Sequence, residues 1–209
     1  MPQPASAPTA VRIATTLASI LLVVALAASG WVLVSIGVGL ARDGDSLIYG
    51  QTLPAPMQLS TDDVGPLPAG LALDSWMDVD VRVQDPSVRQ MVLRSAADIG
   101  TLVLAVWTLW LVRAVLRAVL RGEPFGPGNA RRLRNLGLLL AVGGNLVELV
   151  NYSLRQALYE SLPAIDGAEV GVAGFSLPGG YLLAGLAAFV LATVFAYGAE
   201  LREDVEATI

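Results

Sequence analysis

The chain has 209 residues, of which 55% are hydrophobic and 15% are charged, and its formal net charge is −5. Soluble domains carry about 25% charged residues, so this composition is typical of a membrane protein and argues against a soluble globular enzyme. Cysteine and histidine are both absent, which excludes a disulfide framework, a thiol nucleophile and a Cys/His metal site. All 13 basic residues are arginine, a usage that we interpret as a GC-rich bacterial coding bias.

Four apolar runs predict an all-α membrane protein whose four transmembrane helices form a bundle. The first run, 13–40, contains no charge and is long enough to cross a hydrocarbon core of roughly 30 Å. A cleaved signal peptide is the alternative, because Arg12 precedes the run and "ALAASG" resembles a cleavage site. The run continues for ten residues beyond that site, which favours an uncleaved anchor. The other predicted spans are 96–119, 133–154 and 180–199.

The loop 41–95 between the first two spans is expected to contain short β-strands and the start of the second helix. "WMDVDVRVQ" alternates apolar and polar residues, as a half-buried strand does, and "SLIYGQ" near residue 46 and "AEVGVAG" near residue 168 are candidate partners. The Pro-rich "TLPAPMQLSTDDVGPLPAG" is interpreted as a connector or an edge. Asp85 is the expected N-cap of the second helix, with Pro86 as its first helical residue.

Aspartates in the same loop allow a calcium hypothesis. Asp62 and Asp63 are adjacent, and Asp78 and Asp80 share one face of the predicted strand. The EF-hand spacing is missing, so we favour a solvated turn and strand face, and we expect no metal and no cofactor.

Arginines predict the orientation in the membrane. One side carries Arg12, Arg113, Arg117, Arg121, Arg131, Arg132, Arg134 and Arg202, and the other carries Arg42, Arg82, Arg89, Arg94 and Arg155 in longer loops. Because short arginine-rich segments stay in the cytoplasm, residues 1–12, 120–132 and 200–209 are expected inside. The loops 41–95 and 155–179 then lie outside a bacterial plasma membrane.

Polar residues in the membrane are candidates for function. The expected intramembrane cluster consists of Asp98, Asn145, Glu148, Asn151, Tyr152 and Arg155. A carboxylate inside a membrane is costly unless it is paired, protonated or hydrated. The cluster could be an ion or proton site, or it could fix the register of the helices; we favour the structural alternative.

The last span carries a stripe of small residues, namely Gly180, Ala184, Ala188, Ala192 and Ala196. Such a stripe suits close helix packing, either against a neighbouring helix of the same chain or against a second subunit of a homo-oligomer. The internal neighbour is the favoured alternative.

"RGEPFGPGNARRLRNLG" lies between the second and third spans. It lacks the lysine and the Ser/Thr of a phosphate-binding P-loop. We interpret it mainly as a membrane-topology and lipid-contact segment in which Asn129 caps the third helix. A docking role for a protein partner stays open for Arg121, Gly122, Pro124, Phe125, Asn129, Arg131, Arg132 and Arg134. Acidic residues of the C-terminal "FAYGAELREDVEATI" could pair with its arginines.

These two segments resemble a family of bacterial four-helix membrane proteins known as domain of unknown function 2975 (DUF2975). The matching residues in the inner loop are Gly122, Pro124, Phe125, Asn129, Arg132, Leu133 and Gly137. The matching C-terminal residues are Phe195, Gly198, Leu201, Glu203, Thr208 and Ile209. The resemblance implies four helices, no established activity and a small cytoplasmic helix-turn-helix regulator as a partner.

The preferred functional hypothesis is a non-enzymatic sensory, regulatory or partner-docking membrane protein. The alternative is a small transporter or channel subunit that uses Glu148. An enzyme is not expected, because the chain lacks Cys, His, a G-x-S-x-G elbow and a second deep carboxylate. Direct nucleic-acid binding is not expected either, because the arginine cluster belongs to the ends of membrane helices.

Overall fold

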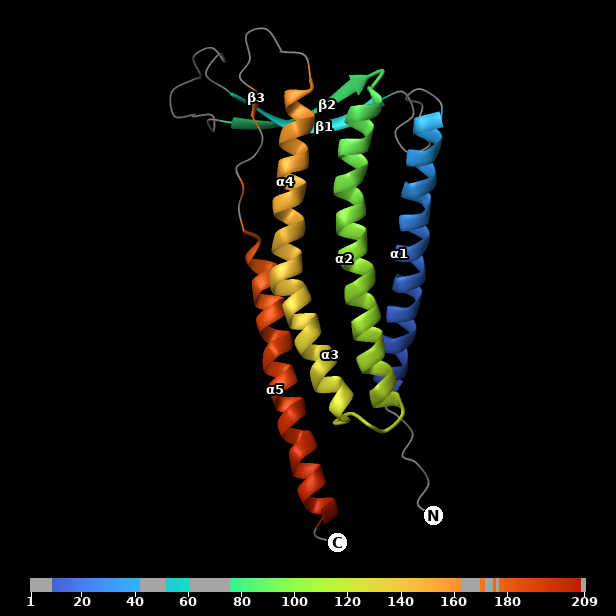
Figure 1. The fold of residues 1–209 in the computed structure, drawn as a ribbon, viewed down its shortest axis with the longest axis vertical. Helices are drawn as coiled ribbons and strands as arrows, with labels where there is room; N and C mark the ends of the chain where they lie inside the picture. The colour runs from blue at the N-terminus through green and yellow to red at the C-terminus, as the bar shows by residue number, and fades with distance from the viewer. Residues whose placement is uncertain are drawn as a thin grey trace, which may run out of the picture. The chain divides into compact units, whose positions relative to one another are not determined.

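The computed structural model describes residues 9–41, 52–60, 76–162, 170–171, 175 and 177–207 (Figure 1). Most of these residues belong to five α-helices: α1 (Thr9–Ala41), α2 (Val88–Leu120), α3 (Pro127–Leu138), α4 (Asn145–Glu160) and α5 (Gly179–Ala207). A π-helical turn, η1 (Leu139–Gly144), joins α3 to α4. The chain divides into a first compact unit (1–29, 100–148 and 177–209) and a second (30–99 and 149–176).

Four helical segments in the described part of the chain are long and apolar enough to cross a membrane. They are Thr9–Ala41, Val88–Leu120, Gly128–Glu160 and Gly179–Val205. Large apolar side chains are widely exposed on them, for example Val23 (66%) and Leu183 (70%). Such a surface is unfavourable in water and favourable in lipid. The prediction of a helical, multi-pass membrane protein with four membrane-length helices is therefore confirmed.

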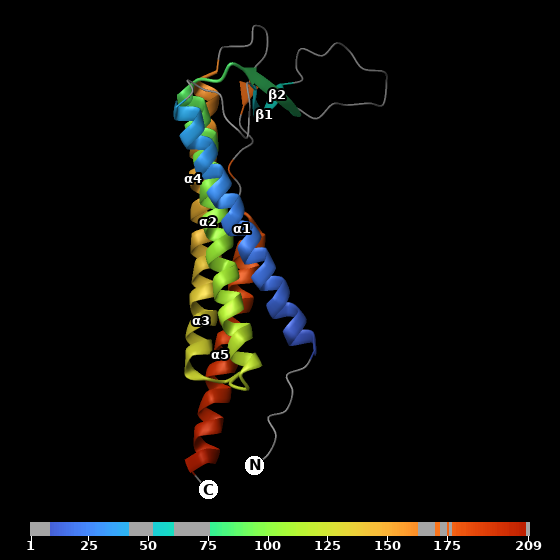
Figure 2. The same cartoon turned by 90° about the vertical axis from the view of Figure 1, so that its right-hand side faces the viewer.

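Within the first unit, four helix termini lie at the same end of the helices, which we call the loop end. They are the start of α1, the end of α2, the start of α3 and the end of α5 (Figures 1 and 2). The connection 121–126 between α2 and α3 lies at this end. Because this connection is short, α2 and α3 are antiparallel neighbours.

The start of α2 differs from the sequence prediction. Asp85 has a φ of 50°, and the helix begins at Val88, two residues later than predicted. Ser87 caps it: the Ser87 amide donates to Gln90 Oε1 at 2.9 Å, and the Gln90 amide donates to Ser87 Oγ at 3.3 Å. This capping box satisfies two amides that a helix start leaves unpaired. Asp85 is therefore not the N-cap, because the Ser87–Gln90 pair supplies both bonds.

α3 and α5 cross at very short range (Figure 1). A Cβ atom on Gly137 would lie 2.9 Å from the carbonyl oxygen of Gly185, and a Cβ atom on Gly185 would lie 2.8 Å from that of Gly137. Only glycine fits such an approach, which allows extensive van der Waals contact between membrane helices. Leu111, Leu136 and Ala188 form a buried apolar core in the same unit.

The small-residue stripe of α5 coincides only in part with the face that packs. Ala188 and Ala192 are buried in the first unit, whereas Gly180 and Ala184 are exposed. Residues spaced by four drift around a helix, because one turn has 3.6 residues. Gly185, the neighbour of Ala184, makes the closest contact. Sequence reasoning missed Gly185, although glycine in a membrane helix is itself a signal of close packing.

Three strands form an antiparallel sheet in the second unit, in the order β2-β1-β3 (Figure 2). They are β1 (Thr52–Ser60), β2 (Trp76–Gln84) and β3 (Val170–Gly171). β1 pairs with β2 over its whole length, while β3 pairs only with Gln58 and Leu59.

β1 occupies the first half of the Pro-rich segment that the sequence predicts to be a connector or an edge; this half is a strand, and within the described sheet it has a second neighbour only at Gln58 and Leu59. Pro54 and Pro56 are two residues apart, and their missing amide donors therefore fall on the same side of the strand. Because the described part of β3 reaches only Gln58 and Leu59, the sheet does not need those donors. The candidate strand near residue 46 lies outside the described residues.

Candidate functional site

The loop at the end of α2 has a defined geometry. Gly122 has a φ of 79°, its amide donates to Val119 O at 3.0 Å, and the Glu123 amide donates to Ala118 O at 3.1 Å. These two bonds form a Schellman motif, which ends a helix with a residue in the left-handed region. Glycine adopts this region without a steric penalty, which explains its place at position 122.

Asn129 ties the loop to α3 and is not the cap that the sequence predicts. Gly126 occupies the N-cap position without a side-chain capping bond. The Asn129 residue is only 1% exposed. Its Nδ2 donates to the carbonyl oxygens of Glu123 (3.3 Å) and Pro124 (2.9 Å), and its Oδ1 accepts from Arg132 (3.0 Å). The side chain therefore bonds backward to the loop and forward to the next turn of the helix.

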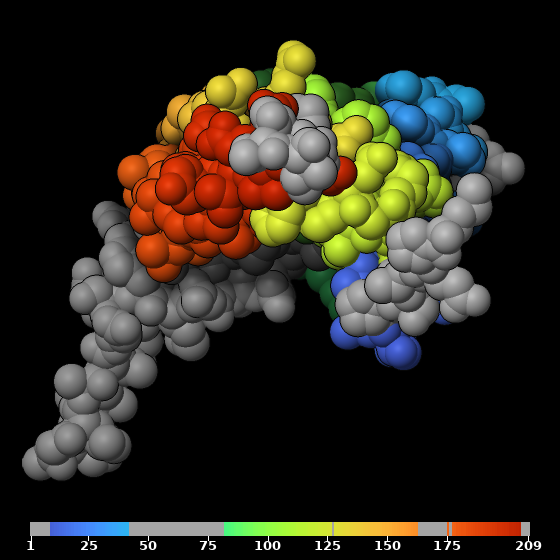
Figure 3. All heavy atoms as spheres, turned by 90° about the horizontal axis from the view of Figure 1, so that it is seen from below, coloured from blue at the N-terminus to red at the C-terminus, as the bar shows by residue number. Residues whose placement is uncertain are grey.

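Phe125 attaches the same loop to α5. Its ring centroid lies 5.5 Å from that of Phe195, with an interplanar angle of 50°. A Cβ atom on Gly198 would lie 2.6 Å from Phe125 Cδ1, so the ring lies directly against the α5 backbone. Tilted aromatic pairs at this distance are favourable. The two segments that carry the motif residues are thus in contact, and Figure 3 shows them together at the loop end.

Two arginines border a groove of about 410 Å³ between α3 and α5. Its walls are Ala130, Arg131, Arg134, Phe189, Ala192, Thr193 and Ala196. Both arginine side chains are exposed. Among the described residues, no ion pair joins them to Glu200 or Glu203. Among the described side chains, the predicted pairing of Glu200 and Glu203 with these two arginines is therefore not observed.

α5 continues beyond its contact with the loop at Gly198 as far as Ala207. These nine residues add about 13 Å of helix at 1.5 Å per residue. Tyr197, Leu201 and Val205 are 69%, 58% and 56% exposed and follow one another at four-residue spacing. They form an exposed apolar stripe, which we call the α5 stripe.

The remaining candidate residues at this end have simpler surroundings. Arg121 and Glu203 are exposed, and Pro124 is half-buried. Thr208 lies outside the described residues.

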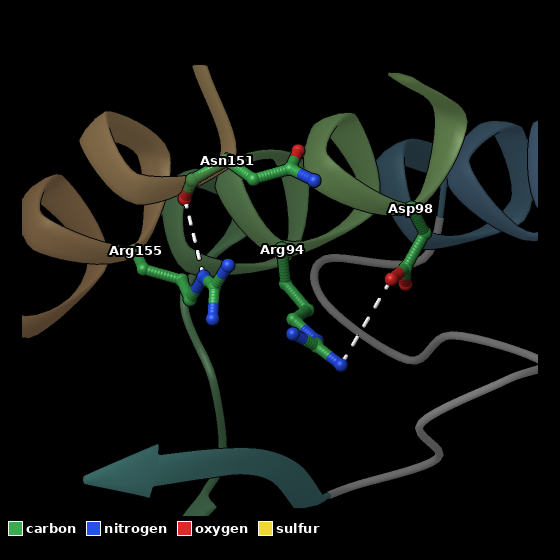
Figure 4. A network of polar contacts seen from close by, with 4 residues as sticks. All are labelled: Arg94, Asp98, Asn151 and Arg155. Atoms are coloured by element: carbon green, nitrogen blue, oxygen red, sulfur yellow. Dashed lines mark hydrogen bonds and ion pairs between the residues drawn. The ribbon is translucent and has the colours of Figure 1, made fainter. Parts of the chain in front are cut away.

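Four predicted or neighbouring polar residues form a network in the second unit (Figure 4). Arg94 Nη2 lies 3.9 Å from Asp98 Oδ1, and Arg155 Nε donates to the Asn151 carbonyl at 3.3 Å. Figure 4 shows the carboxylate of Asp98 turned towards Arg94. The Nε atom of Arg94 is buried and has no partner within the described residues. The distance between Arg94 and Asp98 is therefore long for an ion pair.

Three aromatic residues complete this region of the second unit. The ring of Tyr152 lies 5.7 Å from that of Phe175. Tyr159, which sequence reasoning missed, interacts electrostatically with Arg155 and Arg94. Its position four residues after Arg155 was the available signal, because residues at this spacing share a helix face.

Asn145 and Glu148 belong to the first unit, whereas Asp98, Asn151, Tyr152 and Arg155 belong to the second. Asn145 directly follows η1, and its Nδ2 donates to Ala141 O at 2.7 Å. Its Oδ1 is buried and has no partner in the described part of the chain. Glu148 is half-buried. A π-helical turn next to an unsatisfied amide oxygen is a feature that recurs at functional sites.

Metal ligands are not grouped in the described ranges. There, no three His, Cys, Asp or Glu side chains come close enough together to hold a metal ion. Asp62, Asp63 and the side chains of Asp78 and Asp80 lie outside what the structure describes.

Comparison with known proteins adds a family but no activity. No curated protein and no solved structure matches the chain. The family described as "Protein of unknown function (DUF2975)" matches residues 84–209, more than half of the chain. The match covers the capped start of α2, the loop with Asn129 and Phe125, and the whole of α5. The chain therefore belongs to the DUF2975 family.

Proposed function

We propose that the protein is a non-enzymatic regulatory membrane protein that docks a cytoplasmic protein on the α5 stripe. The observation that carries the proposal is the exposure of Tyr197, Leu201 and Val205 on a helix that continues past the loop. Exposed apolar side chains at i, i+4 and i+8 are the anchors by which one helix binds a groove or a second helix.

The charges that follow the apolar span support a position outside the hydrocarbon. The 29 residues of α5 extend about 43 Å at 1.5 Å per residue, whereas a hydrocarbon core is about 30 Å thick. The additional length lies at the charged C-terminal end of α5. That end contains four acidic residues and one basic residue, namely Glu200, Glu203, Asp204, Glu206 and Arg202. Four carboxylates and one guanidinium leave three negative charges, which are costly in hydrocarbon and stable in water.

The same charges favour a protein partner over the membrane surface. Helices that lie on a membrane carry basic residues that bind anionic lipids. An acidic helix end is repelled by such a surface, so the α5 stripe stays available to a partner. The matching surface would be apolar with basic residues around it. Small helix-turn-helix regulators, which the family resemblance implies as partners, carry basic residues for DNA.

A sensing role for the sheet is part of the proposal. The arginines at the loop end favour a cytoplasmic location for that end, which would place β1, β2 and β3 outside the cell. β2 ends at Gln84 and α2 begins at Val88, so only three residues join them. Two of these are restrained, because Pro86 is buried and Ser87 belongs to the capping box. Displacement of the sheet would therefore act on a membrane helix through a short, stiff connection.

A transporter or channel subunit remains the second candidate. It rests on η1, the unsatisfied Oδ1 of Asn145 and the neighbouring Glu148. Ion or proton flux in liposomes that is lost in Glu148→Gln would favour this candidate over docking.

Site-specific photo-crosslinking in cells tests the docking proposal. With a photo-crosslinking amino acid at position 197, we expect an adduct with a small, basic cytoplasmic protein. Leu201→Ser combined with Val205→Ser should reduce that adduct more than tenfold, because burial of each apolar side chain contributes about 1.5–3 kcal/mol.

The matched control places the crosslinker at position 203, on the opposite side of the α5 helix, where no adduct with that protein is expected. Adducts that contain only lipid or a second copy of this chain would refute the proposed docking role.

A further inference from the structure

We propose that the groove between α3 and α5 binds an anionic phospholipid, with its phosphate held by Arg131 and Arg134. The groove lies in the first unit and has a volume of about 410 Å³. One acyl chain would lie on its apolar floor. The proposal is independent of the docking role of the α5 stripe.

The floor of the groove is apolar, and most of the side chains that line it are small. Ala130 faces Ala192 and Ala196 across the groove, and Phe189 forms part of its wall. Alanines at these positions leave a hollow that leucine would fill. A hollow of this kind beside exposed apolar helices suits an acyl chain, which is as apolar as the helix surface.

The rim is positively charged, and no described residue neutralises it. Arg131 and Arg134 are exposed, and the described residues offer them no ion pair or hydrogen bond. Arg132 differs, because it is bonded to Asn129 at 3.0 Å. A phosphate at this place would offset the repulsion between the two guanidiniums, for which the described residues provide no counter-charge.

The depth of the arginines fits the headgroup layer. They stand on either side of Leu133, where the apolar run of the third span begins, and Arg134 is three residues from the glycine crossing at Gly137. At the end of a membrane helix, long basic side chains extend to the lipid phosphates. Basic pockets between membrane helices are known to bind anionic headgroups.

Binding of defined lipids to the full-length protein in detergent tests the proposal. We expect phosphatidylglycerol to raise the thermal unfolding temperature, and phosphatidylcholine and inorganic phosphate to have no such effect. Arg131→Gln and Arg134→Gln should each weaken the apparent affinity for phosphatidylglycerol about fivefold, and together roughly 25-fold, from the contribution of a basic residue near an anionic lipid.

Arg117→Gln combined with Arg121→Gln is the matched control, since it removes two exposed charges at the same end outside the groove. It should change the affinity less than about twofold, as expected for exposed charges without a bound phosphate. Thr193→Leu keeps both arginines and fills the groove, and should also weaken binding. The proposal is overturned by equal losses in the control, by equal protection from inorganic phosphate or phosphatidylcholine, or by unchanged phosphatidylglycerol binding in a folded Thr193→Leu protein.

Discussion

At the scale of single residues, Asn129 is the side chain on which the loop end depends most. It is almost fully buried and satisfies two loop carbonyls with one amide group. Those carbonyls belong to Glu123 and Pro124, the two residues directly before Phe125. Asn129 thereby holds the backbone that presents Phe125 to α5, which connects a local hydrogen-bond pattern to the packing of a distant helix.

Asn129→Ala should lower the free energy of unfolding of the protein in detergent by about 1–3 kcal/mol, because it removes the three hydrogen bonds that this buried side chain makes. Thermal unfolding followed by intrinsic fluorescence would measure the loss. Asn135→Ala on the same helix is the control, since Asn135 is exposed, and a change within about 0.5 kcal/mol is expected there. Equal effects of the two substitutions would contradict the role assigned to Asn129.

The residue scale also shows where local patterns mislead. Both Asp85 and Asn129 are good capping residues, and both lie within three residues of a helix start. Neither caps its helix, because Ser87 and Gln90 form a reciprocal pair at one start and Asn129 bonds to the loop at the other. Capping propensity therefore identifies the start of a helix to within one turn, whereas the hydrogen bonds that form in the folded chain determine which residue is the cap.

At the scale of elements, the crossing of α3 and α5 is the contact that organises the first unit. Gly137 and Gly185 bring the two backbones together, and Gly144 accepts the ring of Tyr181 close to its Cα. A Cβ atom on Gly144 would lie 2.6 Å from Tyr181 Cγ. α5 therefore lies along α3 and η1 at close range, which positions its far end beside the loop.

Gly137→Ala should destabilise the protein by about 1–3 kcal/mol, the usual cost of overpacking. The added methyl group meets the Gly185 carbonyl, and a backbone atom at a helix crossing cannot rotate away as a side chain can. Thermal unfolding in detergent checks the change.

Gly180→Ala is the control in the same pair of helices, because no atom lies within 4 Å of a Cβ atom at that position. It should be neutral, or stabilising by up to about 1 kcal/mol from helix propensity. If Gly137→Ala were as well tolerated as Gly180→Ala, the close crossing would be wrong.

At the scale of the whole molecule, the orientation in the membrane decides which partners each end can meet. The chain contains no cysteine, so one introduced cysteine is a unique label. In spheroplasts, a membrane-impermeant maleimide should label Gln84→Cys and should label Glu123→Cys or Glu203→Cys only after permeabilisation. The reason is that the arginine-rich segments at the loop end resist translocation.

The labelling is interpretable because the side chains at all three positions, Gln84, Glu123 and Glu203, are exposed. Labelling of Glu123→Cys without permeabilisation would invert the topology. It would also remove the cytoplasmic docking proposal, while leaving the lipid groove to be tested against the outer leaflet.

The sequence by itself determined the class of the protein, the number of membrane-length helices and the family. These follow from the lengths of the apolar runs, the placement of charges and short motifs, all of which are local features of the sequence. Local features suffice because every segment that crosses a bilayer must be apolar and must satisfy its own backbone hydrogen bonds. Phe125, Phe195 and Gly198 were also identified, but only as parts of a motif.

The tertiary structure alone decided which of those residues meet. It brought Phe125 against Gly198 and placed Gly185 and not Ala184 at the helix crossing. It also placed Arg131 and Arg134 on a groove where no described acidic residue pairs with them. The physical reason is that a helix in lipid is apolar on all its faces, so the hydrophobic pattern of the sequence does not reveal which face packs against another helix. That side is set by close van der Waals fit between particular backbones and side chains, which depends on residues far apart in the chain.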